Sequence, residues 1–64
     1  MYFQRLRDLR EDRDLTQKQI AQMLKTSQQH YSRYENGEIE IPLHHFIKLA
    51  NFYEVSLDYL ASRD

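Results

Sequence analysis

The chain has 64 residues, of which 30% are charged and 12% aromatic, and its formal net charge is −1. A chain this short predicts one domain over residues 1–64, whose core buries only about 60% of the unfolded surface. It has no cysteine, which excludes disulfides, a thiol nucleophile and a cysteine-based zinc site. It also has no run of 18 apolar residues and no apolar leader, so we expect a cytoplasmic protein without membrane contact.

The small net charge hides an asymmetry along the chain. Residues 1–34 hold seven basic side chains against four acidic ones, whereas residues 35–64 hold two against six. Because the local field rather than the total charge attracts a polyanion, this distribution predicts a basic face backed by an acidic one. The alternative is an ordinary mixed surface. A modest basic patch would bind nucleic acid with modest affinity and with strong dependence on salt.

The first predicted element is a helix in which Phe3, Leu6 and Leu9 recur every three residues. We expect this helix to end near Arg13 and Asp14, with Asp14 in the left-handed closing position.

Two short helices joined by a tight turn are predicted within residues 15–37. Thr16 and Gln19 have the spacing of a capping box at the start of the first helix, and Ser27 supplies an N-cap for the second. The connection through Lys25 and Thr26 is so short that the two helices must cross at a large angle. The positions predicted to face the core recur at helical spacing, and they are Ile20, Ala21, Leu24, Tyr31 and Tyr34.

The outer face of the second of these helices carries Gln28, Gln29, Ser32 and Arg33. Glutamine can bond adenine N6 and N7, and arginine can bond guanine O6 and N7, each worth roughly 1–3 kcal/mol of discrimination. Gln17 lies in the first turn of the earlier helix, where free backbone N–H groups attract phosphate. The set therefore predicts base reading by one helix and phosphate binding by the other. The alternative is that these glutamines solvate a surface helix.

Two further helices are predicted after Gly37. Pro42 suits the first turn of a fourth helix. Its apolar stripe is expected to consist of Leu43, Phe46, Ile47 and Ala50. Ser56 can cap a short fifth helix that carries Leu57, Leu60 and Ala61. No segment alternates as a strand does, so the predicted fold is all-α, a compact bundle of five helices.

These features in this order resemble the Cro/repressor-type helix-turn-helix domains of lambdoid phage repressors and many small bacterial regulators. The likeness covers essentially the whole chain, and it rests on Leu6, Arg10, Leu15, Thr16, Gln17, Ile20, Ala21, Leu24, Ser27, Gln28, Gln29, residues 32–37, Leu49, Ala50 and residues 55–60. The resemblance implies a five-helix DNA-binding domain with the helix-turn-helix at about residues 16–35. Its third helix would enter the major groove of a palindromic operator, as part of a homodimer.

The chain departs from the family pattern at three places. Lys25 stands where the family usually has glycine in the turn, at a cost on the order of 1 kcal/mol for a left-handed residue. Tyr31 replaces an aliphatic side chain on the inner face of the third helix. The acidic and apolar residues 38–41 stand where the family commonly has a basic loop that holds phosphates.

The function we expect is that of a sequence-specific transcriptional regulator, a repressor that acts by occupying double-stranded DNA. Base reading is assigned to Gln28, Gln29 and Arg33. The backbone contacts are assigned to Thr16, Gln17, Lys25, Ser27 and Asn36, with charge added by Arg5 or Arg7, and His30 and Ser32 are candidate further contacts. The alternative function is a protein-interaction module of the same fold, such as an anti-repressor or antitoxin, which the acidic loop and near-neutral charge would suit.

Catalysis, a cofactor, a bound metal and a small-molecule ligand are not expected. His44 and His45 are adjacent, so they point about 100° apart on a helix and cannot chelate as i, i+4 ligands do. Ser27 and His30 share a helix face, but no carboxylate orients the histidine for nucleophilic catalysis.

Two further sets of residues have structural interpretations. Arg10 and Glu35 resemble a pair that bridges the first and third helices in the family, and a phosphate contact by Arg10 is the alternative. Aromatic and aliphatic side chains near the C-terminus exceed what a small core needs, and they predict a dimer contact through Phe52, Tyr53, Leu57 and Tyr59.

Overall fold

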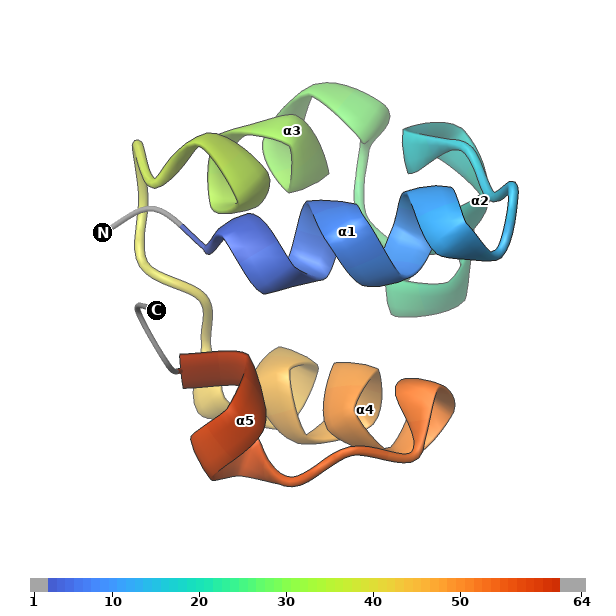
Figure 1. Cartoon of the computed structure of the whole chain (residues 1–64). Helices are drawn as coiled ribbons and strands as arrows, with labels where there is room; N and C mark the ends of the chain where they lie inside the picture. Colours follow the sequence, from blue (N-terminus) through green and yellow to red (C-terminus); the bar gives the residue numbers. More distant parts are fainter. Residues whose placement is uncertain (1–2, 62–64) are drawn as a thin grey trace.

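The computed structural model describes residues 3–61, which form five helices (Figure 1). These helices are α1 (Gln4–Asp12), α2 (Gln17–Leu24), α3 (Gln28–Asn36), α4 (Leu43–Tyr53) and α5 (Leu57–Ala61). In Figure 1, α1, α2 and α3 form the upper part of the molecule, and α4 and α5 lie below α1. Residues 3–61 contain no strand, so the all-α prediction is confirmed. None of the helices described is long and apolar enough to cross a membrane.

The predicted caps fix where α2 and α3 begin. The Thr16 hydroxyl accepts a hydrogen bond from the Gln19 backbone N–H at 3.1 Å, and Gln19 Oε1 accepts one from the Thr16 N–H at 2.8 Å. This is the complete capping box. Ser27 Oγ accepts from the backbone N–H of His30 at 3.0 Å, so both predicted N-caps are confirmed.

Among residues 3–61, three non-glycine residues adopt the left-handed conformation next to helix ends. They are Asp14, Lys25 and Glu54, with φ of 55°, 61° and 57°. The left-handed conformation of Asp14 was predicted from the sequence. Lys25 adopts this conformation at the turn position where the resemblance implied glycine. Such a conformation costs roughly 1–2 kcal/mol for a residue with a Cβ. The short turns of this fold therefore keep their geometry against an unfavourable backbone preference.

The core lies where all five helices converge, and its largest side chains are tyrosines. Tyr31 and Tyr34 are 0% and 1% exposed, which confirms the inward face predicted for α3. Their rings meet edge to face with centroids 6.1 Å apart. The other buried apolar residues are Leu6, Ile20, Ala21, Leu24, Leu49, Ala50, Tyr53 and Leu60.

The apolar stripe predicted for α4 is confirmed at Phe46 and Ala50 and was wrong at Leu43 and Ile47. Leu43 is 67% exposed and Ile47 is 40% exposed, whereas Leu49 and Tyr53 are buried. The buried stripe continues from Phe46 through Leu49 and Ala50 to Tyr53, which also has helical spacing. This second stripe buries a whole tyrosine ring, which favours packing the Leu49 and Tyr53 side of α4 against the core.

Pro42 also lies one residue earlier than predicted. It is the N-cap residue with φ −58° and ψ 145°, and its carbonyl accepts from the N–H groups of His45 and Phe46. The extended ψ keeps Pro42 outside the helix. The predicted cap of α5 is confirmed, because Ser56 Oγ accepts from the Tyr59 N–H at 3.0 Å.

Candidate nucleic-acid interface

One concave surface, with a volume of about 570 Å³, gathers side chains from α2 and α3. We call it the α2–α3 surface. It is lined by Gln17, Gln28, Gln29, Ser32, Arg33 and Glu38. Five of these six were assigned to DNA contact from the sequence, and Glu38 was not. The structure thus brings together polar side chains from two helices that are separated by a turn of only three residues.

The turn between α2 and α3 sets how these side chains face outward. The left-handed Lys25 donates its N–H to the Gln22 carbonyl at 3.1 Å, and Thr26 donates to the Ala21 carbonyl at 2.9 Å. These two bonds satisfy carbonyls at the end of α2. The chain then reaches Ser27, whose hydroxyl oxygen caps α3. Lys25 and Ser27 are both exposed here, next to the first turn of α3.

Beneath this surface a buried carboxylate joins α1, α2 and α3. Glu35 is 0% exposed, and its Oε2 accepts from Arg10 Nε and from the Tyr31 hydroxyl, both at 2.7 Å. Its Oε1 accepts from Arg10 Nη2 and from Gln17 Nε2, both at 3.1 Å. Arg7 Nε lies 3.6 Å from Oε1. All of the carboxylate's hydrogen-bonding capacity is therefore used inside the protein.

The protonation of this cluster follows from its contacts. Burial by itself would raise the pKa of Glu35, but hydrogen bonds from Arg10, Tyr31 and Gln17 outweigh it, so the pKa is lowered. Burial and the hydrogen bond to Glu35 raise the pKa of Tyr31. The hydrogen bond to Glu35 raises the pKa of Arg10, although burial opposes it. Glu35 is therefore an anion, and Arg10 and Tyr31 keep their protons.

Arg10 has a structural role here. Its Nε and Nη2 bond Glu35, and its Nη1 donates to the Leu15 carbonyl at 3.0 Å. The guanidinium thereby bridges α1 to α3, and it also holds the end of the α1–α2 connection, directly before the N-cap of α2.

Gln17 is positioned by the same carboxylate. One of its amide N–H groups donates to Glu35, which leaves the other N–H and the amide oxygen available to a ligand. The sequence predicted the ligand contact of Gln17 but missed this internal bond. The bond spans 18 residues, so no local pattern could have indicated it.

Asn36 and Arg7 are linked at the far end of α3. Arg7 Nη2 donates to Asn36 Oδ1 at 3.1 Å, and Asn36 Nδ2 donates to Glu38 Oε2 at 3.3 Å. Asn36 was assigned to the DNA backbone, and its amide is engaged by protein groups on both sides. Glu38 was missed. The signal that could have found it is Gly37, because a left-handed glycine folds the next residue back over the last helical turn.

The remaining candidate contacts do not line this surface. His30 is exposed, and its ring meets that of Tyr34 edge to face at 5.1 Å. The Tyr34 hydroxyl lies 3.0 Å from His45 Nδ1, which connects α3 to α4. The Thr16 hydroxyl is used in the capping box. Arg5, which was expected to add charge for DNA, lies with Cζ 4.2 Å from the Tyr59 ring centroid instead.

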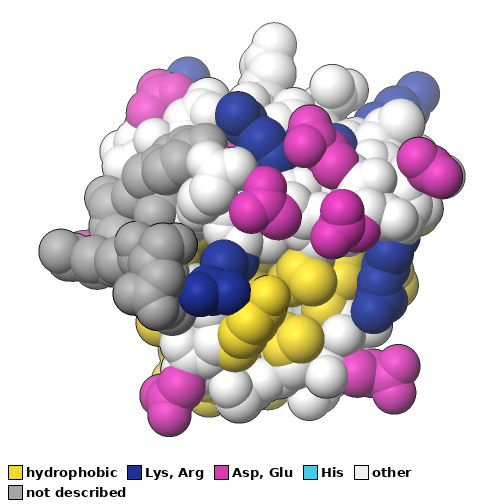
Figure 2. Space-filling model, viewed as in Figure 1, with side chains coloured by type: hydrophobic (Ala, Val, Ile, Leu, Met, Phe, Trp, Pro, Cys, Tyr) yellow, Lys and Arg dark blue, Asp and Glu magenta, His cyan; other side chains and the backbone are white. Residues whose placement is uncertain are grey.

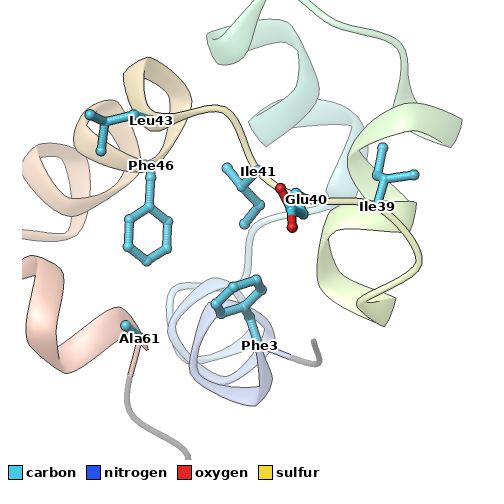
Figure 3. A pocket seen from close by; sticks show the side chains of 7 residues that line it. All are labelled: Phe3, Ile39, Glu40, Ile41, Leu43, Phe46 and Ala61. Atoms are coloured by element: carbon cyan, nitrogen blue, oxygen red, sulfur yellow. The ribbon is translucent and has the colours of Figure 1, made fainter.

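A second hollow is apolar and lies elsewhere (Figure 3). Its volume is about 340 Å³, and it is lined by Phe3, Ile39, Glu40, Ile41, Leu43, Phe46 and Ala61. Figure 3 shows that these side chains come from the start of α1, the α3–α4 connection, α4 and the end of α5. Glu38 and Glu40 therefore border different hollows, although they are two residues apart.

The side chains predicted to form a dimer contact divide into two groups. Phe52, Leu57 and Tyr59 are 39%, 39% and 42% exposed, but Tyr53 is 2% exposed. Tyr53 belongs to the core, so it offers no surface to a partner, and its assignment as a dimer contact was wrong. Figure 2 shows hydrophobic side chains gathered on the lower half of one face, below acidic side chains and between basic ones.

The sequence of the chain has relatives among known proteins. Residues 6–60 match the model of the helix-turn-helix family. The chain is similar to YobD of Bacillus subtilis (strain 168), an uncharacterized HTH-type transcriptional regulator, with 40% identity over 94% of this chain and 54% of that protein. It is similar to RstR of Vibrio cholerae, the cryptic phage CTXphi transcriptional repressor, with 37% identity over 97% of this chain and 56% of the relative.

A third relative is ImmR of Bacillus subtilis (strain 168), an HTH-type transcriptional regulator that is 35% identical over 94% of this chain and 47% of its own length. The chain thus spans about half the length of the curated relatives it matches. No solved structure is significantly similar to it.

Proposed function

Because the chain belongs to the helix-turn-helix family, we propose that it is a sequence-specific DNA-binding regulator of transcription that reads base pairs with α3. The observation that carries this proposal is the α2–α3 surface, where amide and guanidinium groups from two helices converge. Such groups match the donor and acceptor pattern of the major groove. A buried ion pair and two N-caps hold the helices that present them.

The roles divide between the helices. Gln28, Gln29 and Arg33 of α3 contact base edges, and Ser32 borders them. Gln17, held by Glu35, donates its second amide N–H to a phosphate and so fixes the position of the protein on the duplex.

The protein acts as a homodimer and as a repressor. Phe52, Leu57 and Tyr59 supply partly exposed apolar side chains that a second copy can cover. Arg13 supports this region, because its Nη2 donates to the Tyr53 carbonyl at 3.2 Å and so ties α1 to the end of α4. Repression is supported by the similarity to a phage repressor.

The proposal is tested by selecting bound duplexes from a random pool, sequencing them, and measuring affinity for the selected site. The expected result is a palindromic motif with half-sites about one helical turn, or roughly 34 Å, apart. Gln28→Ala should cost about 1–3 kcal/mol at particular base pairs and relax the preference there. Gln17→Ala should weaken all duplexes alike. Gln22→Ala is the matched control, since Gln22 is exposed on α2 but does not line the surface.

Two results would contradict the proposal. Salt-sensitive binding that enriches no motif would leave only non-specific attraction. An equal loss for Gln28→Ala on every site variant would remove its base-reading role. Dimerisation is tested by sedimentation with and without DNA, and a Leu57→Glu protein that dimerises as the unaltered protein does would refute the assigned contact.

A further inference from the structure

Glu38 is the residue of the α2–α3 surface that the proposed function does not use. Of the six residues that line this surface, Arg33 and Glu38 carry the charges, so the surface as a whole is formally neutral. Proteins gain sequence-independent affinity for DNA by neutralising phosphates with cations. A carboxylate at this place works against that gain.

The backbone holds Glu38 in place. Gly37 adopts φ 73°, and the Glu38 N–H donates to the Arg33 carbonyl at 3.0 Å. The main chain of Glu38 is thereby bonded to the last turn of α3. The bond that ends α3 therefore sets the backbone position of Glu38, beside the other residues that line this surface.

The Glu38 carboxylate also accepts a hydrogen bond from Asn36, whose amide N–H groups could otherwise donate to a phosphate. Asn36 Nδ2 donates to Glu38 Oε2 at 3.3 Å, while Asn36 Oδ1 accepts from Arg7 Nη2 at 3.1 Å. Arg7 in turn lies 3.6 Å from the buried Glu35. A chain of polar contacts therefore runs from the buried carboxylate to the exposed one, and the Asn36 amide is held between them.

We propose, on the basis of the proposed function, that Glu38 limits the affinity of this surface for the DNA backbone. Its charge repels phosphate, and its carboxylate holds the amide donor of Asn36. Binding then depends on the base contacts of α3 more than on charge. Glu38 is a residue that sets affinity, and it does not read a base.

The experiment compares Glu38→Gln with Glu40→Gln in fluorescence-anisotropy titrations. Both variants raise the net charge by one, but Glu40 borders the apolar hollow (Figure 3). Each protein is titrated with a random duplex and with the selected duplex over a range of salt concentrations. Thermal unfolding of each variant checks that the fold is intact.

We expect E38Q to bind both duplexes roughly three- to tenfold more tightly, from the loss of one like charge close to phosphate. The slope of log affinity against log salt should steepen by about 0.9, equivalent to one more neutralised phosphate. The selected motif should stay the same, and E40Q should change affinity less than twofold. Glu38→Ala, which also removes the acceptor for Asn36, should bind more tightly than E38Q.

Other outcomes separate the two proposals. If the unaltered protein selects a motif but E38Q and E40Q behave alike, the role of Glu38 is refuted and the proposed function stands. If E38Q binds more weakly or selects a different motif, Glu38 accepts a hydrogen bond from a base, and the affinity-limiting role is wrong. Equal affinities of E38A and E38Q would refute the part assigned to Asn36. If neither the unaltered protein nor E38Q binds any duplex, both proposals fail.

Discussion

Tyr31 and Tyr53 are two buried tyrosines whose hydroxyl groups have opposite surroundings. The Tyr31 hydroxyl donates to Glu35 at 2.7 Å, whereas the buried Tyr53 hydroxyl has no hydrogen-bond partner among residues 3–61. Tyr31→Phe removes a hydrogen bond to a charged group, which is worth roughly 1.5–3 kcal/mol. We therefore expect a loss of about 2 kcal/mol, because Glu35 keeps its bonds from Arg10 and Gln17.

Tyr53→Phe is the matched control, since it deletes the same atom from an equally buried ring. Removing an unpaired buried hydroxyl should leave stability unchanged or raise it by about 1 kcal/mol. Urea unfolding monitored by circular dichroism measures the stability of both variants. If their m-values are equal, the unfolding midpoints can be compared directly. In a domain of this size 2 kcal/mol lowers Tm by roughly 8–16 °C. Equal stabilities for the two variants would refute the claim that the Glu35 hydrogen bonds stabilise the fold.

Three further predictions concern the same interior and its turns. Glu35→Gln should lower the free energy of unfolding by about 3–5 kcal/mol in urea titrations, because it leaves the partly buried Arg10 without its counter-charge; a loss below 1 kcal/mol would contradict this. Stability should fall in two stages on acidification, since burial and neighbouring cations lower the pKa of His45 from 6.5 and hydrogen bonds lower that of Glu35 from 4.5. The stability that each group contributes is fully present above its ordinary pKa and is lost as the pH falls toward its lowered pKa in the folded protein. The first loss of stability belongs to His45, so His45→Gln should abolish it in unfolding curves measured from pH 7 to 3. Lys25→Gly should raise stability by about 0.5–1 kcal/mol by relieving the left-handed conformation, and a lower Tm would show that the Lys25 side chain stabilises the turn.

The features that could be predicted from the sequence are those determined within one helical turn. A hydroxyl at Thr16 or Ser27 caps the residues immediately after it, and the spacing of Tyr31 and Tyr34 sets one inward face. These effects need no knowledge of distant segments. They were sufficient to place the helix-turn-helix and the outward side chains of α3.

The features that escaped prediction depend on segments far apart in the chain. Phe46 and Ala50 belong to two overlapping apolar stripes on α4, and only packing against the other helices selects the one that contains Tyr53. The bond from Gln17 to Glu35 has the same origin, since neither residue indicates its partner. Glu38 was missed because the acidic loop was treated as one segment, whereas its two acidic side chains border different hollows.

The carboxylate of Glu35 also constrains how this sequence can change by mutation. It accepts from three side chains on three helices, so replacing any one member leaves the others with an unmet bond or charge in the interior. The effects of substitutions at Arg10, Gln17, Tyr31 and Glu35 will therefore be strongly epistatic. If single substitutions replace all four residues by apolar ones in succession, the partly substituted proteins will be less stable than both the starting protein and the fully substituted one. The residues of α3 proposed to contact bases, Gln28, Gln29 and Arg33, do not bond this carboxylate. Under the proposed function, they can therefore change one at a time while the interior stays the same.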